Sequence, residues 1–151
     1  MDEDVKLLWT ADDRISLFRS TLNEQFRFKG ETGDNAGTFS IVNAPFGTGN
    51  DLNCHYAVYP YASDIEITEK GVITATLPAK QNYVADAFDR EVYAMAGIAI
   101  EAAPESEETP NKLVANVELT PVVGLITLPL TLDSATASNP VLVKSISFTA
   151  N

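Results

Sequence analysis

Apolar and polar residues alternate with a period of two along most of this chain, and this alternation limits the possible folds more than any other feature. The clearest example lies near the C-terminus, in residues 126–132. Every second residue there is apolar, and two of the three residues between them are threonines: Ile126, Leu128, Leu130 and Leu132. Successive side chains of a strand point to opposite faces, so such a stretch forms a strand with one apolar face. The pattern predicts an all-β protein, an antiparallel β-sandwich of about seven to ten strands with little helix.

Turn-forming clusters separate the alternating stretches and place the predicted strands. In the N-terminal half we expect strands at 15–18, 25–28, 38–42 and 55–61, followed by a short hairpin at 65–67 and 72–77. An irregular stretch with one helical turn near 85–88 then precedes strands at 91–100, 113–119, 126–132 and 145–149. Pro129 has no N–H group to donate, which puts its strand at a sheet edge or a bulge.

Length and charge restrict the class of protein. The 151 residues fit a single domain, 1–151, that is large enough to bury a core. A net charge of −11 makes contact with phosphate backbones or anionic membranes unfavourable, so nucleic acid is not an expected partner. The acidic stretch 101–111 contains two prolines and lacks the ligand spacing of a calcium loop, so we expect a solvated loop there.

Signals for compartment and membrane are sparse. No stretch approaches the ~20 apolar residues of a membrane-spanning helix. The single cysteine, Cys54, has no partner within the chain for a disulfide. The acidic start, Met-Asp-Glu-Asp, is unlike a signal peptide. Taken literally it indicates a cytoplasmic protein; if the Met was added to a trimmed chain, it says nothing about export.

Residues suited to catalysis are few and scattered. The sole histidine, His55, follows Cys54 in a predicted strand, where neighbours point to opposite faces and cannot easily pair as nucleophile and base. Asp12 and Asp13 could supply one acid of a glycosidase pair, but no second acid is indicated. The glycine-containing turns lack the spacing of phosphate-binding loops. We therefore predict a protein that is not an enzyme and has no metal site and no cofactor.

The aromatic residues allow two interpretations. Tyrosine and tryptophan have flat apolar faces and a polar atom, so Trp9, Tyr59 and Tyr61 could stack on a sugar or another ligand. In a sandwich of this size the same rings more often fill the core and its corners. The sequence leaves both interpretations open.

Several stretches follow one another in an order known from one protein family. Residues 9–18 read WTADDRISLF, residues 56–61 read YAVYPY and residues 77–81 read LPAKQ, and later stretches at 88–95, 120–130 and 144–150 complete the series. These resemble the motifs W-x-x-x-D-x-I-x-V-F, Y-A-x-Y-P-Y and L-P-x-x-Q, and then the closing strands, of the fimbrillin-like family of Bacteroides-type bacteria. Asp12 departs from the pattern, because the family usually has glycine there.

The resemblance implies a fold and a setting. The fold would be a transthyretin-like sandwich of Greek-key type, here the N-terminal domain of a longer two-domain surface protein. Such proteins are exported to the cell surface or outer membrane as lipoproteins. The signal and the lipidated cysteine would precede this chain, so that contact with a membrane would occur only through an anchor outside it.

The resemblance also implies a function. The chain would be an adhesin or a pilus-associated structural subunit, and its partners would be other pilus or surface subunits joined by β-strand addition. The alternative is a sandwich module that binds a carbohydrate, or another ligand of a host. Asp133-Ser134-Ala135 is similar to the O-glycosylation acceptor of the same bacterial group, which makes Ser134 a candidate modification site.

Overall fold

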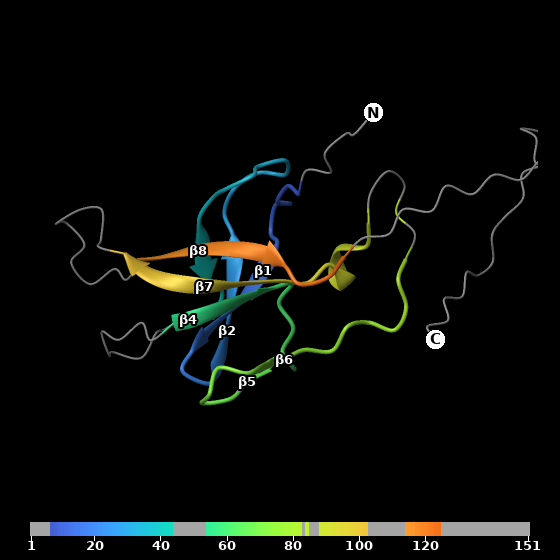
Figure 1. Ribbon diagram of the computed structural model, residues 1–151. Helices are drawn as coiled ribbons and strands as arrows, with labels where there is room; N and C mark the ends of the chain where they lie inside the picture. The colour runs from blue at the N-terminus through green and yellow to red at the C-terminus, as the bar shows by residue number, and fades with distance from the viewer. Residues whose placement is uncertain (1–6, 44–53, 83, 85–87, 103–113, 125–151) are drawn as a thin grey trace, which may run out of the picture.

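The computed structural model describes residues 7–43, 54–82, 84, 88–102 and 114–124 (Figure 1). In these ranges the regular structure is β-strand apart from one short 3-10 helix, η1 (Arg90–Val92). The strands are β1 (Arg14–Arg19), β2 (Leu22–Phe28), β3 (Phe39–Ile41), β4 (Cys54–Tyr59), β5 (Glu66–Ile67), β6 (Ile73–Thr74), β7 (Met95–Ala102) and β8 (Val114–Pro121).

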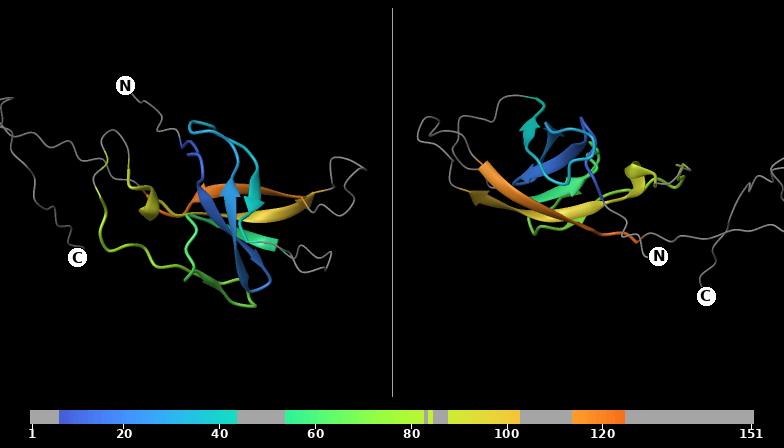
Figure 2. Two further views of the ribbon diagram at one scale, coloured as in Figure 1. Left: turned by 180° about the vertical axis from the view of Figure 1, so that it is seen from behind. Right: turned by 90° about the horizontal axis from the view of Figure 1, so that it is seen from above.

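Six of the strands form one antiparallel sheet in the order β3-β2-β1-β4-β7-β8. Because β4 returns beside β1 after two hairpin connections, the order β3-β2-β1-β4 is that of a Greek key. The sheet is strongly curled, so β2 and β3 run across the direction of β7 and β8 (Figure 2). The all-β antiparallel prediction is confirmed.

The inner face of the curled sheet carries most of the core. Its side chains come from alternate positions of the strands and form two adjoining clusters around Leu17 and Ile15, with these further members: Ala57, Tyr59, Tyr93, Met95 and Ala99. Partly buried residues of β8 complete it, namely Ala115, Val117 and Leu119. The period-two pattern of the sequence thus places one apolar set on one side of the sheet.

The opposite side, which we call the hairpin face, is covered by the separate hairpin β5–β6. Phe18 and Val58 of the sheet pack there against Ile65 and Ile67, with Ile73 at the margin of the cluster. Asn23 fixes the start of this hairpin, because its side-chain amide donates hydrogen bonds to the carbonyl oxygens of Ala62 (2.9 Å) and Ile65 (3.1 Å). The hairpin therefore forms a small second layer over the middle of the sheet.

The strand predicted at 91–100 is wrong in its boundaries. The strand predicted at 91–100 begins only at Met95 and continues to Ala102, so it takes in the first two residues of the predicted loop 101–111. Residues 90–92 instead form η1, because the carboxylate of Asp89 accepts a hydrogen bond from the backbone N–H of Glu91 (3.2 Å) and caps the turn. Of the helical turn predicted near 85–88, residues 85–87 lie outside the described residues, and Phe88 is not helical.

The remaining strand predictions differ in extent. β6 pairs over two residues only, within the predicted 72–77, and 75–82 has no regular structure. The strands predicted at 126–132 and 145–149, and most of the loop predicted at 101–111, lie outside the described residues.

Candidate functional site

Trp9 lies at one end of the inner face and joins the two N-terminal motifs. Its ring stacks on Phe28 at a centroid distance of 5.6 Å and meets Phe39 and Tyr59 edge-on, at 5.1 and 5.5 Å. Such offset and edge-to-face arrangements are the favourable geometries of aromatic pairs. The tryptophan of the first motif therefore packs directly on a tyrosine of the Tyr-Pro-Tyr motif.

Asp13 connects the same corner by polar contacts. Its carboxylate accepts a hydrogen bond from the Thr10 backbone N–H (2.7 Å), and both of its oxygens accept from Arg90 Nη1 (3.1 and 3.0 Å). The Tyr59 hydroxyl donates to Asp13 as well, over 3.4 Å. Arg90 in turn donates from Nη2 to the carbonyl oxygen of Leu8. One carboxylate thus links the N-terminal turn, the end of β4 and η1.

The phenol of Tyr59 is held in its neutral form at this corner. Burial, reinforced by the negative charge of Asp13, raises the pKa of Tyr59 to about 12. Arg90 acts in the opposite direction but does not offset the other two causes. Desolvation of an ionisable group favours its neutral form, so Tyr59 acts here as a hydrogen-bond donor within a packed corner.

The three aromatic residues considered for ligand stacking occupy different environments. Tyr59 is buried, with 5% of its surface exposed, and Trp9 is half-buried among rings of the core. The ring contacts of these two residues are made within the protein, which favours the core interpretation for them. Tyr61 is half-buried, and its backbone N–H donates to the Arg14 carbonyl oxygen (2.9 Å). It alone of the three stands outside the buried clusters.

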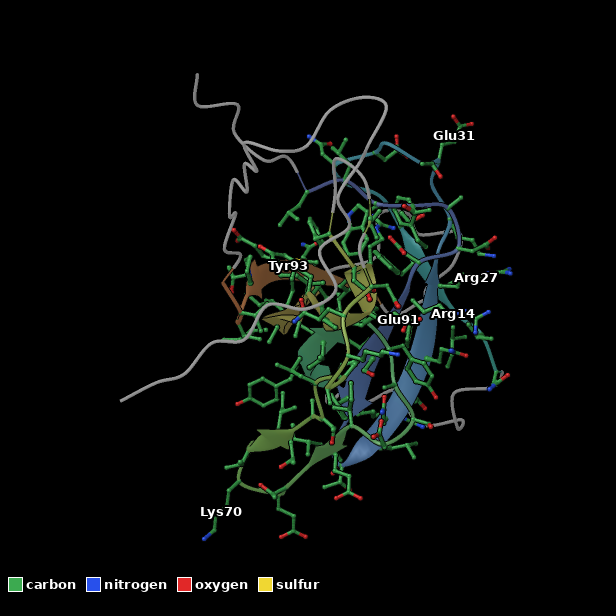
Figure 3. The ribbon with its side chains drawn as sticks, turned by 90° about the vertical axis from the view of Figure 1, so that its right-hand side faces the viewer. Arg14, Arg27, Glu31, Lys70, Glu91 and Tyr93 are labelled. Carbon is green, nitrogen blue, oxygen red and sulfur yellow. The ribbon has the colours of Figure 1, made fainter. Side chains whose placement is uncertain are left out.

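Residues considered for catalysis or metal binding do not converge. Asp13 is hydrogen-bonded to Arg90 and Tyr59. Asp12 is exposed and lies 3.6 Å from Nη1 of Arg27, whose side chain points outward (Figure 3). Within the described ranges, no group of three or more histidine, cysteine and acidic side chains could hold a metal ion. Cys54 and His55 open β4, and Ser134 lies outside the part of the chain that the structure describes. No helix in the described ranges is long and apolar enough to cross a membrane.

The two edges of the six-stranded sheet differ in length. β3 pairs over three residues, whereas β8 spans eight. An edge strand offers a row of backbone N–H and C=O groups on which another strand can pair. β8 is therefore the better template for strand addition.

The ladder between β7 and β8 shows which groups of β8 point outward. The Val122 N–H donates to the Ala94 carbonyl oxygen, and pairs that exchange hydrogen bonds alternate along an antiparallel ladder. The pairs that bond to β7 are thus those with even numbers in β8. The backbone groups of Ala115, Val117 and Leu119 point away from β7 and have no backbone partner among the described residues.

Pro121 occupies the next outward position of β8. Its missing N–H group therefore leaves the β7 ladder intact. Because the side chains of Ala115, Val117 and Leu119 belong to the inner face, a strand added at this edge would continue that face. We define the backbone groups of these three residues as the β8 edge.

The sequence analysis did not predict a structural role for two residues that make long-range hydrogen bonds, Arg90 and Asn23. Arg90 is distant in sequence from Asp13, and no local pattern connects them. Asn23 lies in an alternating strand, where it resembles any solvent-facing polar residue. Asp89, a helix-capping residue type directly before Arg90, is the sequence signal that could have indicated a turn at this position.

Comparison of the chain with protein-family models, curated proteins and solved structures finds no match.

Proposed function

We propose that this chain is a fimbrillin-like structural domain that works at the cell surface, as an adhesin or pilus-associated subunit, by strand addition at the β8 edge. The observation that carries the proposal is the length of that edge and the direction of its backbone groups. Ala115, Val117 and Leu119 offer N–H and C=O groups at every second residue, which is the pattern that a pairing strand requires.

The contact between two of the family-like motifs also supports the proposal. Trp9 of the first motif packs on Tyr59 of the second, and Asp13 accepts a hydrogen bond from the same tyrosine. In this proposal these residues form a packed corner of a structural scaffold. The net charge of −11 suits a displayed surface protein that must stay soluble until it is assembled.

Ala115→Pro tests the proposal at the edge itself. Proline at this outward position removes one N–H group from the β8 edge but leaves the hydrogen bonds to β7 in place. In the full-length protein, treated with a trypsin-like protease to trigger assembly, we expect SDS-resistant ladders from the unchanged chain and their loss in Ala115→Pro.

The matched control is Ala115→Val, which keeps the N–H group and should keep the ladders. Circular dichroism should show that both variants are folded. An unchanged chain that stays monomeric after protease treatment would contradict a shaft-subunit role, and ladders that persist in Ala115→Pro would exclude the β8 edge as the site.

A further inference from the structure

β8 presents a different chemistry on each of its two sides. Its side chains alternate between half-buried and exposed along residues 115–120. The half-buried members pack on the inner core: Ala115, Val117 and Leu119. The exposed members lie on the hairpin face, beside β7: Asn116, Glu118 and Thr120. In the sequence of this strand, VANVELTP, Glu118 is the one charged residue.

The carboxylate of Glu118 has no partner among the described side chains. Its neighbours on the hairpin face are uncharged, with Asn116 and Thr120 on the same strand and Ile98 opposite on β7. None of the ion pairs or side-chain hydrogen bonds within the described ranges includes it. A strand that pairs with β8 would therefore meet a single unpaired negative charge on this side.

The outward backbone groups determine how closely a partner's side chain would approach Glu118. Val117 and Leu119 point their N–H and C=O groups away from β7, so they would form the hydrogen-bonded pairs with an antiparallel strand. Glu118 lies between them and would form a non-hydrogen-bonded pair, in which the Cα atoms are about 4.5 Å apart instead of about 5.5 Å. Cross-strand side chains are closest in such pairs, and opposite charges there stabilise the pairing.

Taking the proposed strand addition at the β8 edge as its basis, we infer that the partner strand runs antiparallel to β8, places apolar side chains at every second position and carries one lysine or arginine opposite Glu118. Every pair of neighbouring strands in the described sheet is antiparallel. The apolar side of the partner extends the inner core beyond Val117 and Leu119. The cation neutralises Glu118 in a chain whose net charge of −11 disfavours a further anion.

This chemistry fixes the alignment of the partner in two steps. A slip by one residue would turn the apolar side of the partner towards the hairpin face and away from the inner core. A slip by two residues would keep the apolar side inward but would move the cation from Glu118 to Asn116 or Thr120, which carry no charge. The single acid thus selects one alignment among those that the apolar pattern allows.

Two peptides of about seven residues, within the usual length of a strand, test the charge of the partner. Valine alternates with threonine in both, and the central threonine is replaced by lysine in one peptide and by glutamate in the other. Fluorescence anisotropy measures their binding to the full chain at about 0.15 M salt, where distant charges are screened. We expect the lysine peptide to bind at least about threefold more tightly than the glutamate peptide.

Two charge reversals on the protein locate this preference. Glu118→Lys should reverse it, so that the glutamate peptide binds more tightly. Glu66→Lys changes the net charge equally and is the matched control. Glu66 is exposed on β5, in the hairpin whose start is held by Asn23 of β2, and β1, β4 and β7 lie between β2 and β8. The preference for the lysine peptide should therefore persist in this variant. Circular dichroism should show that both variants are folded.

The outcomes separate this inference from the proposed function. Equal affinities of the two peptides for the unchanged chain, or the same order of affinities in Glu118→Lys, would overturn the inference. If Ala115→Pro abolishes the binding of both peptides, strand addition at the β8 edge is supported whichever charge is preferred. If neither peptide binds the unchanged chain, or if both still bind Ala115→Pro, the proposed function fails and the inference fails with it.

Discussion

The two halves of the sheet are built from similar sequences but are covered differently. In β1, four consecutive residues, 15–18, are buried because the inner core lies on one side and the β5–β6 hairpin on the other. In β7, Ala99 is buried while Ile98 and Ile100 on either side of it are exposed. Burial of a strand is thus decided by the layers that pack on it, since both strands are rich in apolar residues.

The two halves are also held together by different contacts. At one end of the β1–β4 half, the ring contact of Trp9 and the hydrogen bonds between Asp13 and Arg90 join segments that are far apart in sequence. In the described part of the β7–β8 half, the two strands contribute to the inner core and are joined by their ladder, with a close backbone approach at Gly97. Substitutions should therefore act through packing and corner contacts in the first half and through backbone fit in the second.

The largest expected effect lies in the doubly covered half. Phe18→Ala removes a ring that is 1% exposed between the sheet and the hairpin, and should lower the free energy of unfolding by about 3 to 5 kcal/mol. Leu22→Ala, at an exposed position of β2, should change it by no more than about 0.5 kcal/mol. Urea denaturation measures both. Similar costs for the two variants would mean that the hairpin does not form a packed layer.

Gly97→Ala tests the β7–β8 half. A Cβ atom at this position would lie 1.9 Å from the backbone carbonyl oxygen of Glu118, so the two strands would have to separate. We expect a loss of about 3 kcal/mol in thermal or urea unfolding. Gly124→Ala is the matched control, because nothing lies within 4 Å of the added Cβ there. Equal stability of the two variants would show that the close approach at Gly97 is absent.

Alkaline unfolding tests the corner of the first half. The pKa of Tyr59 is raised from 10.0 to about 12 in the folded protein, so between these values the folded state holds a proton that the unfolded state has released. The corresponding stability is complete below pH 10 and should be lost as the pH rises towards 12, by about 2 kcal/mol.

The matched pair for this test is Tyr59→Phe and Tyr61→Phe. Urea unfolding across the alkaline range should show a shallower loss of stability in Tyr59→Phe, because the group with the raised pKa is gone. Tyr61→Phe retains Tyr59 and should follow the unchanged protein. An identical pH dependence in all three proteins would contradict a neutral, buried Tyr59.

The smallest expected effect concerns Asp12. Its φ of 68° lies in the left-handed region, which glycine adopts without strain. Asp12→Gly should raise the free energy of unfolding by about 0.5 kcal/mol, even though it removes the exposed contact with Arg27. Asp12→Ala loses the same carboxylate but keeps the strain, so the difference between the two variants in urea denaturation measures the backbone effect. A more stable Asp12→Ala would contradict it.

Alternation predicted the strands well because each strand of the sheet has at least one apolar face. The positions of β1, β2 and β4 follow from it, and so does the all-β class. It misplaced the start of β7, where the Asp89 cap competes with strand formation and turns residues 90–92 into η1. Such a cap is a local signal and was readable from the sequence.

Contacts between segments that are distant in sequence could not be predicted from the sequence. Nothing in the sequence pairs Arg90 with Asp13 or Asn23 with the hairpin. Alternation also cannot show which face of a strand is covered: Ser16 is fully buried although it stands at a polar position of β1, and Ile98 is exposed at an apolar position of β7. The edge strands of the sheet can be identified only when the order of the strands is known, and the alternation within single strands does not give this order.

Pro121 limits the β8 edge at its C-terminal end. A strand pairing along Ala115, Val117 and Leu119 finds a donor at each of these positions, but at Pro121 it meets a ring without an N–H group. In the proposed strand addition, regular pairing with a partner strand would therefore stop at this residue. The proline would fix the register at which such a strand begins or ends its hydrogen bonds to β8.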